Sequence, residues 1–516
     1  MIRRRSTALE LDDLVLSPPV TTPAEPPSGA FLLTATLRAR GRRAALLDLS
    51  LELFYRLLED ERLPARRPAA AAVRYLLDAE DGYSPHEHRS ATGSIHRLLR
   101  GLGSLYPGWR MTLMDLEAPV RVHDPLALAR RLSEDSGPLA GLWTEALDPV
   151  LEATRPSRAL ISLAYLSQLA AAIDLARHLE RRGVETIVGG SLVRSLALTG
   201  HGLDELSRAL PGLSTDDGSQ LTGEPPLERL AWPLLLGDRP YLGARPVVPL
   251  ALSTGCHWRR CLFCPDRALP FRPLSLSALS GLLSSMPASV RERGPVCHLL
   301  DSALPPGRLA AFLPLAREHG VSFYGFARPT RELTRGGLLE AAADSGCAML
   351  QLGVESGSRD LLARFDKGID PAEARQVLRV ASAAGIRTYV YLLFGLPGES
   401  EADREATLEL VRESEGEGEI DFLNTSLFNL PRDCELTRRA GELGLEIEKF
   451  PGDDAILRLY RPFVVDGLRP RDQARAFLRR RFDPDPSVRA ARLRTPRWLR
   501  AAHLAMMRLP GRRGPA

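Results

Sequence analysis

Three cysteines lie within nine residues of one another near the middle of the 516-residue chain: Cys256, Cys261 and Cys264. They follow the apolar run Val247–Leu252, which predicts a strand, so we expect them on the loop that leaves its carboxyl end. A closed zinc site or a fully ligated iron–sulfur cluster normally takes four protein ligands. Three thiolates on a four-iron cluster would leave one iron open to a small molecule. A structural zinc loop with a remote fourth ligand, such as His257, is the alternative.

The cysteine spacing is C-x4-C-x2-C, with Trp258 inside the longer gap and Phe263 directly before the last cysteine. This loop resembles the cluster-binding loop of the radical S-adenosylmethionine (SAM) enzymes, whose commonest spacing is C-x3-C-x2-C. Similar longer loops occur in the branch of that family with an N-terminal cobalamin-binding-like domain. The resemblance implies that Cys256, Cys261 and Cys264 hold a [4Fe–4S] cluster and that Phe263 belongs to the cofactor site. It also implies that the open iron chelates the amino and carboxylate groups of SAM.

Six apolar strands alternate with amphipathic helices from Val247 onward, and this pattern predicts a parallel sheet covered by helices. The expected strands are 247–252, 296–300, 321–326, 348–354, 387–394 and 422–428. The expected helices are 275–286, 307–318, 335–345, 371–384 and 401–413. Eight such units close a full barrel, so six predict an open, partial (β/α)6 TIM-like barrel. In such folds the chemistry gathers on the loops at the carboxyl ends of the strands.

The fourth expected strand runs into Gly-Val-Glu-Ser-Gly-Ser at residues 353–358, a stretch that resembles a SAM-binding motif of the family. The resemblance implies that Glu355 and Ser356 contact the ribose and the amino group of SAM. A carboxylate suits this role because it accepts hydrogen bonds from both an ammonium group and ribose hydroxyls. The alternative is a helix N-cap, in which Ser356 or Ser358 caps the helix that follows.

The fifth expected strand runs into Gly395-Leu-Pro397-Gly398-Glu399, which resembles the family motif that flanks the adenine of SAM. Gly395, Pro397 and Gly398 are therefore candidate cofactor contacts, because glycines let the backbone approach a ligand closely. A plain strand-to-helix turn is the alternative. Arg328, at the end of the third strand, is a candidate partner for the SAM carboxylate through a bidentate contact. In an arginine-rich chain, a structural or surface role is the alternative for Arg328.

The sequence before the cysteines predicts a Rossmann-like domain, with its clearest strand–helix–strand unit at residues 158–196. Further elements are expected as strands at 31–37 and 44–48, a helix that follows to Leu58, and a short helix at 227–236. The unit resembles the last part of a cobalamin-binding-like domain, where Ser162 and Gly189-Gly190 would approach the nucleotide tail of the cofactor. The D-x-H-x-x-G signature is absent from the sequence. We therefore favour a Rossmann-like domain that has lost cobalamin and keep cobalamin binding as the alternative.

Composition limits the cellular setting and the partners. A net charge of +4, spread along the chain, gives no nucleic-acid signature, and only two of the 68 basic residues are lysines. Six cysteines in a chain of this length do not suggest a disulfide framework. No signal-peptide core or stretch of about 20 apolar residues is present, so we expect a cytoplasmic protein without a membrane span.

These observations predict a flexible lead-in (1–29), a Rossmann-like domain (30–236), a linker (237–246), a partial barrel (247–440) and a mostly helical C-terminal region (441–516). The resemblance implies an enzyme that cleaves SAM reductively to a 5′-deoxyadenosyl radical. Its substrate is expected to be a small molecule or a peptide, with methylation possible if cobalamin binds, and its electron donor a ferredoxin or flavodoxin. A non-catalytic, zinc-stabilised binding protein is the rival hypothesis.

Overall fold

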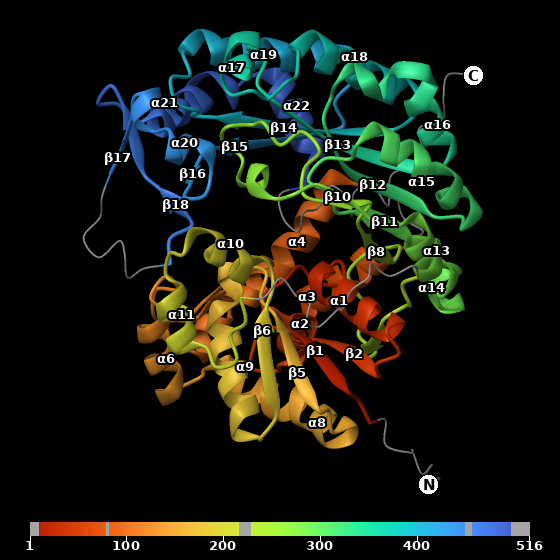
Figure 1. Ribbon diagram of the computed structural model, residues 1–516, viewed down its shortest axis with the longest axis vertical. Coiled ribbons are helices and arrows are strands. Elements are labelled where there is room, and N and C mark those ends of the chain that lie inside the picture. The colour runs from red at the N-terminus through yellow and green to blue at the C-terminus, as the bar shows by residue number, and fades with distance from the viewer. Residues whose placement is uncertain (1–9, 79–81, 216–228, 449–456, 497–516) are drawn as a thin grey trace.

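The computed structural model describes residues 10–78, 82–215, 229–448 and 457–496, and it contains two large parallel sheets in two domains (Figure 1). A five-stranded sheet forms the centre of the N-terminal domain, which runs from red to yellow in Figure 1. A six-stranded sheet forms the centre of the second domain, in green to blue. Helices cover both sheets, which confirms the predicted α/β class with a Rossmann-like domain followed by a partial barrel.

The N-terminal sheet has the strand order β6-β5-β1-β2-β7, and all of its pairs are parallel. Its strands are β1 (Asp13–Ser17), β2 (Ala44–Asp48), β5 (Arg158–Ser162), β6 (Glu185–Gly189) and β7 (Leu234–Leu236). The chain builds outward from β1 in one direction through β2 and in the other through β5 and β6. The carboxyl ends of β1 and β5 therefore flank a topological switch point, where open α/β sheets bind ligands.

Three predictions for this domain are wrong. The lead-in predicted at 1–29 contains β1, the central strand, all five residues of which are buried. The run is short and is followed directly by Pro18-Pro19, so its sequence pattern favours a loop. The strand predicted at 31–37 is part of α1 (Ser28–Ala39), because its buried residues recur at helical spacing. The described part of the helix predicted at 227–236 contains β7 instead, which pairs with the open edge of β2.

Other predictions for this domain are confirmed. The strand at 44–48 and the helix after it are β2 and α2, and the unit at 158–196 is β5, α9 and β6. The remaining helices cover the sheet or extend the domain toward the barrel. The helices are α1, α2 (Leu49–Glu59), α3 (Arg66–Leu77), α4 (Pro85–Arg100), α5 (Leu102–Leu105), α6 (Pro125–Glu134), α7 (Pro138–Leu142), α8 (Asp148–Thr154), α9 (Leu169–Arg181), α10 (Ser191–Thr199) and α11 (Leu203–Ala209). A small hairpin joins β3 (Arg110–Met111) and β4 (Leu116–Glu117).

The second sheet has the order β15-β14-β13-β12-β11-β8, with every pair parallel, as predicted. Its strands are β8 (Val247–Leu250), β11 (Val296–Leu299), β12 (Ser322–Ala327), β13 (Cys347–Glu355), β14 (Arg387–Phe394) and β15 (Phe422–Leu427). Its helices are α13 (Leu276–Ser284), α14 (Ala288–Arg291), α15 (Pro306–Glu318), α16 (Leu338–Asp344), α17 (Arg359–Arg364), α18 (Pro371–Ala383) and α19 (Glu401–Gly416). Each expected helix falls within two or three residues of an observed one, because the apolar periodicity matches helices packed on a sheet.

The C-terminal region mixes short strands with helices that pack on β15. The strands β16 (Leu430–Pro431), β17 (Leu445–Ile447), β18 (Tyr460–Arg461) and β19 (Phe463–Val465) form two small antiparallel pairs. The helices are α20 (Glu435–Arg438), α21 (Pro470–Phe477) and α22 (Pro486–Arg494). The amide of Leu423, in β15, donates to Thr495 Oγ1 at 2.8 Å, which fixes the end of α22 against the edge of the sheet. The amphipathic helix expected near residue 500 lies outside the described residues.

One hydrophobic cluster spans the two domains and joins α1 to β8 and to the helices that cover β11 and β12. A buried polar contact reinforces this interface: His298 Nδ1, on β11, lies 2.8 Å from Glu25 Oε2 in the segment between β1 and α1. The hydroxyl of Tyr83 donates to the backbone oxygen of Arg494 at 2.8 Å, and so links the N-terminal domain to α22. Among the described residues, no helix has the length and apolar content needed to span a bilayer.

Candidate functional site

The cysteine loop lies at the carboxyl end of β8, as predicted. Cys261 is buried, and Cys256 and Cys264 are half-buried. Burial raises the pKa of Cys261, and a neighbouring Cys256 thiolate raises it further, although Lys367 and Arg328 oppose the shift. Burial also raises the pKa of Cys264 to about 12, with contributions from Asp266 and Cys261. The three sulfurs therefore lie within electrostatic reach of one another and of two cations.

Asp301 fixes the strand end from which this loop departs. The side chain is almost fully buried at the end of β11, and its Oδ2 accepts from the amide of Leu252 at 2.8 Å. Its other oxygen accepts from the hydroxyl of Ser253. The carboxylate thus ties the ends of two neighbouring strands together, directly before the first cysteine.

Arg328 lies between the cysteine loop and the loop after α17. Its Nη1 is 3.9 Å from Cys261 Sγ, and its Nη2 donates to the backbone oxygens of Lys367 and of Gly368, the latter at 3.0 Å. The guanidinium carbon also lies 4.2 Å from the ring centroid of Trp258, a cation–π contact. These contacts place a buried positive charge beside the cluster thiols. The bidentate contact of Arg328 with the SAM carboxylate stays a prediction, since two backbone carbonyls already use one of its nitrogens.

Trp258 explains the extra residue in the cysteine spacing. Its Nε1 donates to the backbone oxygen of Asp366 at 2.7 Å, and its ring covers Gly368. A Cβ at Gly368 would lie 2.0 Å from the Trp258 ring, so only glycine leaves room there. The longer gap between the first two cysteines therefore lets an aromatic ring lock the cluster loop onto the loop after α17.

Lys367 is a buried cation at the centre of the site, although no sequence motif marks it as a site residue. Its Nζ lies 2.8 Å from Glu355 Oε1, and only 10% of its side chain is exposed. Its ammonium also lies 5.9 Å from the ring centroid of Phe263. Burial lowers the pKa of Lys367, but Glu355 and Cys261 outweigh burial, so the pKa is raised and the ammonium stays charged. The one available signal was that Lys367 is one of two lysines in an arginine-rich chain.

Glu355 ends β13 with its backbone in the left-handed region, at φ +64°. The register of β13 against β14 shifts between Gly353 and Glu355, so the carboxylate turns across the rim of the sheet. A Cβ at Gly353 would lie 2.9 Å from Glu355 Oε1 and 3.3 Å from Lys367 Nζ. Glycine at position 353 therefore makes room for this ion pair. Strain of this kind at a non-glycine residue clusters at functional sites in proteins.

Ser356 and Ser358 serve the local structure. Ser356 is fully buried; its hydroxyl lies 3.0 Å from Thr407 Oγ1 and accepts from the amide of Ser358 at 3.1 Å. The hydroxyl of Ser358 accepts from the amide of Leu361 at 3.2 Å and caps α17. The N-cap interpretation is thus confirmed for Ser358. A SAM contact of Ser356 stays a prediction, and the observed partners of its hydroxyl are structural.

The loop after β14 places Gly395, Pro397 and Gly398 at the same rim. Gly395 and Gly398 both adopt positive φ, +84° and +68°, which favours glycine. Glu399 is buried and accepts from the amide of Gly395 at 2.7 Å while pairing with Arg404 at 3.4 Å. The Glu399 carboxylate therefore shapes the loop from inside. The contact of this loop with adenine stays a prediction.

The residues at this rim fit the cluster and SAM better than they fit zinc. Each thiolate of a four-iron cluster binds a different iron, so the sulfurs line a wider ring than the ligands of one ion. Within the described ranges, no three His, Cys, Asp or Glu side chains are placed to hold a single metal ion. His257, the suggested fourth zinc ligand, has its Nδ1 3.2 Å from the backbone oxygen of Ala303. Two buried cations beside three thiols suit an anionic cluster, and the carboxylate of Glu355 suits the SAM ammonium.

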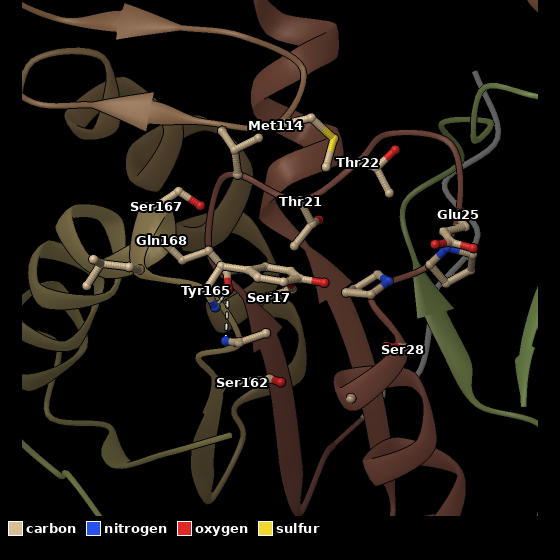
Figure 2. Close-up of a pocket in the computed structure, with 16 residues that line it drawn as sticks. Ser17, Thr21, Thr22, Glu25, Ser28, Met114, Ser162, Tyr165, Ser167 and Gln168 are labelled. Carbon is tan, nitrogen blue, oxygen red and sulfur yellow. Dashed lines mark hydrogen bonds between the residues drawn. The ribbon is translucent and has the colours of Figure 1, made fainter. Parts of the chain in front are cut away.

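A second candidate site lies at the switch point of the N-terminal sheet. A cavity of about 160 Å³ opens between the carboxyl ends of β1 and β5, and Ser17, Ser162, Thr21 and Gln168 line it. Figure 2 shows the ring of Tyr165 lying across this cavity. Gln168 Oε1 accepts from the amides of Ala164 and Tyr165, at 2.9 and 3.0 Å, and so holds the loop after β5. Ser162 lines this cavity, and its approach to a nucleotide tail stays a prediction.

Gly189-Gly190 does not line this cavity. Gly190 instead packs against the loop after β5, where a Cβ would lie 2.4 Å from the backbone oxygen of Leu163. The cavity has room for one end of a cobalamin rather than for the whole cofactor. Neutral hydroxyl and amide groups at its base are suitable partners for the neutral base and the sugar hydroxyls of a nucleotide tail.

Residues 308–411 match the family model described as the radical SAM superfamily. The matched segment runs from α15 to α19, so it includes Glu355, Lys367 and Gly395. Together with the cysteine loop that precedes it, this match identifies the central barrel of the chain as a radical SAM domain.

Comparisons with individual proteins extend the likeness to the whole fold. The solved structure of the cobalamin-dependent SAM radical enzyme OxsB with aqua-cobalamin bound is 15% identical, with a TM-score of 0.52; it covers 90% of this chain and 66% of that one. The structure of OxsB with aqua-cobalamin and SAM bound has a TM-score of 0.50 at 14% identity, covering 87% and 64%. The radical SAM methyltransferase TsrM from Kitasatospora setae has a TM-score of 0.43 at 14% identity, covering 86% and 82%.

Among curated proteins, a 69-residue stretch is 44% identical to tRNA-2-methylthio-N(6)-dimethylallyladenosine synthase of Chlorobium phaeobacteroides (strain DSM 266 / SMG 266 / 2430). This stretch covers 13% of the chain and 16% of the synthase. The chain thus spans 64 to 66% of the OxsB chains and a small part of the synthase. The likeness to OxsB shows that the two chains share a fold in which a Rossmann-like domain precedes a partial barrel.

Proposed function

We propose that the protein is a cobalamin-dependent radical SAM enzyme that modifies a small-molecule or peptide substrate by methylation. The observation that carries the proposal is the buried charged group at the barrel rim, where three cysteines, Arg328, Lys367 and Glu355 converge. When bound, a reduced [4Fe–4S] cluster with SAM supplies a 5′-deoxyadenosyl radical. Cys256, Cys261 and Cys264 would hold the cluster.

The residues of the chain would bind, orient and shield. Glu355 would accept from the SAM ammonium, and the buried cations Lys367 and Arg328 would balance the negative charge of the ligated cluster. The loop at 395–398 would flank the adenine. The sheet and its covering helices would keep water away from the reacting atoms.

The crevice at β1 and β5 supports the cobalamin part of the proposal. It occupies the switch point of the sheet, and Met114 lines both this crevice and the large cavity inside the barrel. When bound, cobalamin supplies a transferable methyl group. Ser17, Ser162 and Gln168 would bind its tail, and the shared wall at Met114 would bring its exposed face toward the barrel. A ferredoxin or flavodoxin of the cytoplasm would supply electrons.

Anaerobic reconstitution of the full chain with iron and sulfide tests the cluster. The proposal expects a brown protein with an iron–sulfur spectrum, and release of 5′-deoxyadenosine and methionine from SAM on reduction. Titration with hydroxocobalamin tests the second cofactor, by comigration of the cobalamin spectrum with the protein in gel filtration. A chain that binds zinc, releases no 5′-deoxyadenosine and excludes cobalamin would refute the proposal.

A further inference from the structure

The interior of the partial barrel contains the largest cavity among those described here, with a volume of about 1090 Å³. Its wall combines the inner faces of four strands, β12 to β15, with α4 of the N-terminal domain and α22 near the C-terminus. Figure 1 shows α4 lying between the two sheets. Three parts of the chain that are remote in sequence thus enclose one space.

One wall of the cavity is aromatic. Tyr389 and Tyr391 of β14 lie with their ring centroids 4.5 Å apart, and Phe326 of β12 lies 5.0 Å from Tyr391. All three rings line the cavity, together with Tyr83. Aromatic faces at this spacing bind a flat ring by offset stacking or edge contacts.

Gln351, which lines the same cavity, has a buried polar atom that no described residue partners. Gln351 of β13 is 5% exposed, and its Nε2 donates to Tyr391 Oη at 3.1 Å. Its Oε1 is buried and accepts no hydrogen bond from any described residue. A buried carboxamide oxygen without a donor costs free energy, so a ligand that brings an N–H or O–H group would recover it.

The open side of the cavity is cationic. Arg89 of α4 and Arg489 of α22 both line it and are exposed. Arg492 lines it as well, although Asp483 pairs with Arg492 at 2.6 Å. Three guanidinium groups against one carboxylate leave a net positive charge that attracts a carboxylate or phosphate.

The distance between this cavity and the barrel rim matches the length of a bound cofactor. Gln351 and Gly353 share one face of β13, and a Cβ at Gly353 would lie 2.9 Å from Glu355 Oε1, so the Glu355 carboxylate returns to that face despite the register shift. Along the strand, Gln351 and Glu355 are about 13 Å apart. Such a separation leaves room for the nucleoside of SAM between the cluster loop and a ligand held at Gln351. The cavity is therefore placed to hold the molecule on which a radical formed at the rim would act.

We propose that this cavity is the substrate site and that it selects a flat heteroaromatic ring with an N–H donor and an attached carboxylate or phosphate. The ring packs against Tyr389, Tyr391 and Phe326, its N–H donates to Gln351 Oε1, and its anionic group pairs with Arg89 and Arg489. This proposal rests on the proposed function only for what happens after binding.

Calorimetric titration of the full, cluster-loaded chain under anaerobic conditions tests the proposal. Indole-3-acetate supplies all three features, 1-methylindole-3-acetate lacks the N–H donor, and indole lacks the anion. Adenosine 5′-monophosphate carries the same chemistry from a nucleotide source. We expect indole-3-acetate or adenosine 5′-monophosphate to bind. The probe that binds more tightly shows whether the natural ligand is a heteroaromatic carboxylate or a nucleotide. We expect loss of either the donor or the anion from the indole probe to weaken binding about tenfold.

Variants assign the contacts to residues. Gln351→Met should erase the preference for indole-3-acetate over its N-methyl analogue, because Met has no acceptor. Arg89→Gln with Arg489→Gln should erase the preference for indole-3-acetate over indole. Arg480→Gln is the matched control, since Arg480 is exposed and lies outside the cavity, and it should change neither.

Two results would overturn the proposal: neither anionic probe binds, or the N-methyl preference persists in Gln351→Met. Failure of the proposed function is recognised separately. The probes should still bind to Cys261→Ala protein without a cluster, whereas SAM cleavage should be lost. If the chain binds the probes but never cleaves SAM, the assignment of the cavity as a ligand site stands and the radical chemistry is refuted.

Discussion

The two parallel sheets of this protein place very different groups at their carboxyl ends. The barrel rim carries ionic groups: Arg328 lies beside Cys261, Lys367 pairs with Glu355, and the thiols lie within electrostatic reach of both cations. The crevice of the N-terminal sheet carries mostly neutral groups, with Ser17, Ser162, Thr21 and Gln168 at its base. The same geometry therefore suits an ionic cofactor in one domain and a neutral group in the other.

This difference teaches that a switch point or barrel rim fixes where a ligand binds but not what it is. Burying a charge costs several kcal/mol unless it is paired, as an order of magnitude. A rim that buries or half-buries six ionisable groups consequently needs a charged partner, and a crevice of hydroxyls and amides does not.

Removal of one cluster thiol should have the largest effect. Cys261→Ala should abolish both the iron–sulfur spectrum and 5′-deoxyadenosine formation, because two thiolates cannot hold the cluster securely. Cys347→Ala is the matched control, since Cys347 is a buried core residue at the start of β13 and should leave the spectrum intact. An intact cluster in Cys261→Ala protein would contradict the assignment of the rim.

Removal of the buried cation should destabilise the cluster-free chain. Lys367→Met leaves Glu355 buried without its partner and should cost about 3–5 kcal/mol in the free energy of unfolding. Chemical denaturation measures this loss, and Glu355→Gln in the same chain should restore most of it. Arg375→Met removes a surface ion pair with Glu413 and should cost less than about 1 kcal/mol. Equal losses of unfolding free energy in Lys367→Met and Arg375→Met would show that the rim ion pair stabilises the fold no more than a surface ion pair does.

The buried Glu399 should make stability depend on pH. Burial raises the pKa of Glu399 from 4.5 to about 7, although the Gly395 amide and Arg404 oppose the shift. Between pH 4.5 and 7 the unfolded chain loses this proton first, so the free energy of unfolding falls as pH rises, by about 3 kcal/mol. Glu399→Gln should flatten this fall, measured by denaturation at several pH values. Glu401→Gln, at an exposed position, should leave the slope unchanged.

A bulky side chain in the crevice of the N-terminal sheet should weaken cobalamin binding and leave the cluster unchanged. Ser162→Phe places a large ring among the groups that would bind the tail, and should weaken cobalamin binding at least tenfold in a spectroscopic titration. The iron–sulfur spectrum and SAM cleavage without substrate should persist, because the cluster loop lies in the other domain. Ser191→Phe, exposed outside the crevice, is the control and should bind cobalamin normally. Equal affinity in the two variants would place cobalamin elsewhere or exclude it.

Most of the barrel was predictable because its information is local. Near-continuous apolar strands separated by amphipathic helices identified all six strands, and the rule that chemistry follows strand ends located the cysteines, Glu355 and Gly395. The N-terminal domain was less predictable. Its central strand, β1, is only five residues long, and β7 is strand only because β2 offers it an open edge.

The sequence by itself determined the cysteine loop, the alternation of strands and helices, and the turns that need glycine, because each depends on neighbours a few residues away. Only the tertiary structure decided that Lys367 pairs with Glu355, that Arg328 approaches Cys261, and that Gln351 faces a cavity closed by α4 and α22. Most of these partners are tens or hundreds of residues apart along the chain. Burial sets the strength of their charges and hydrogen bonds, and burial exists only after the chain has folded.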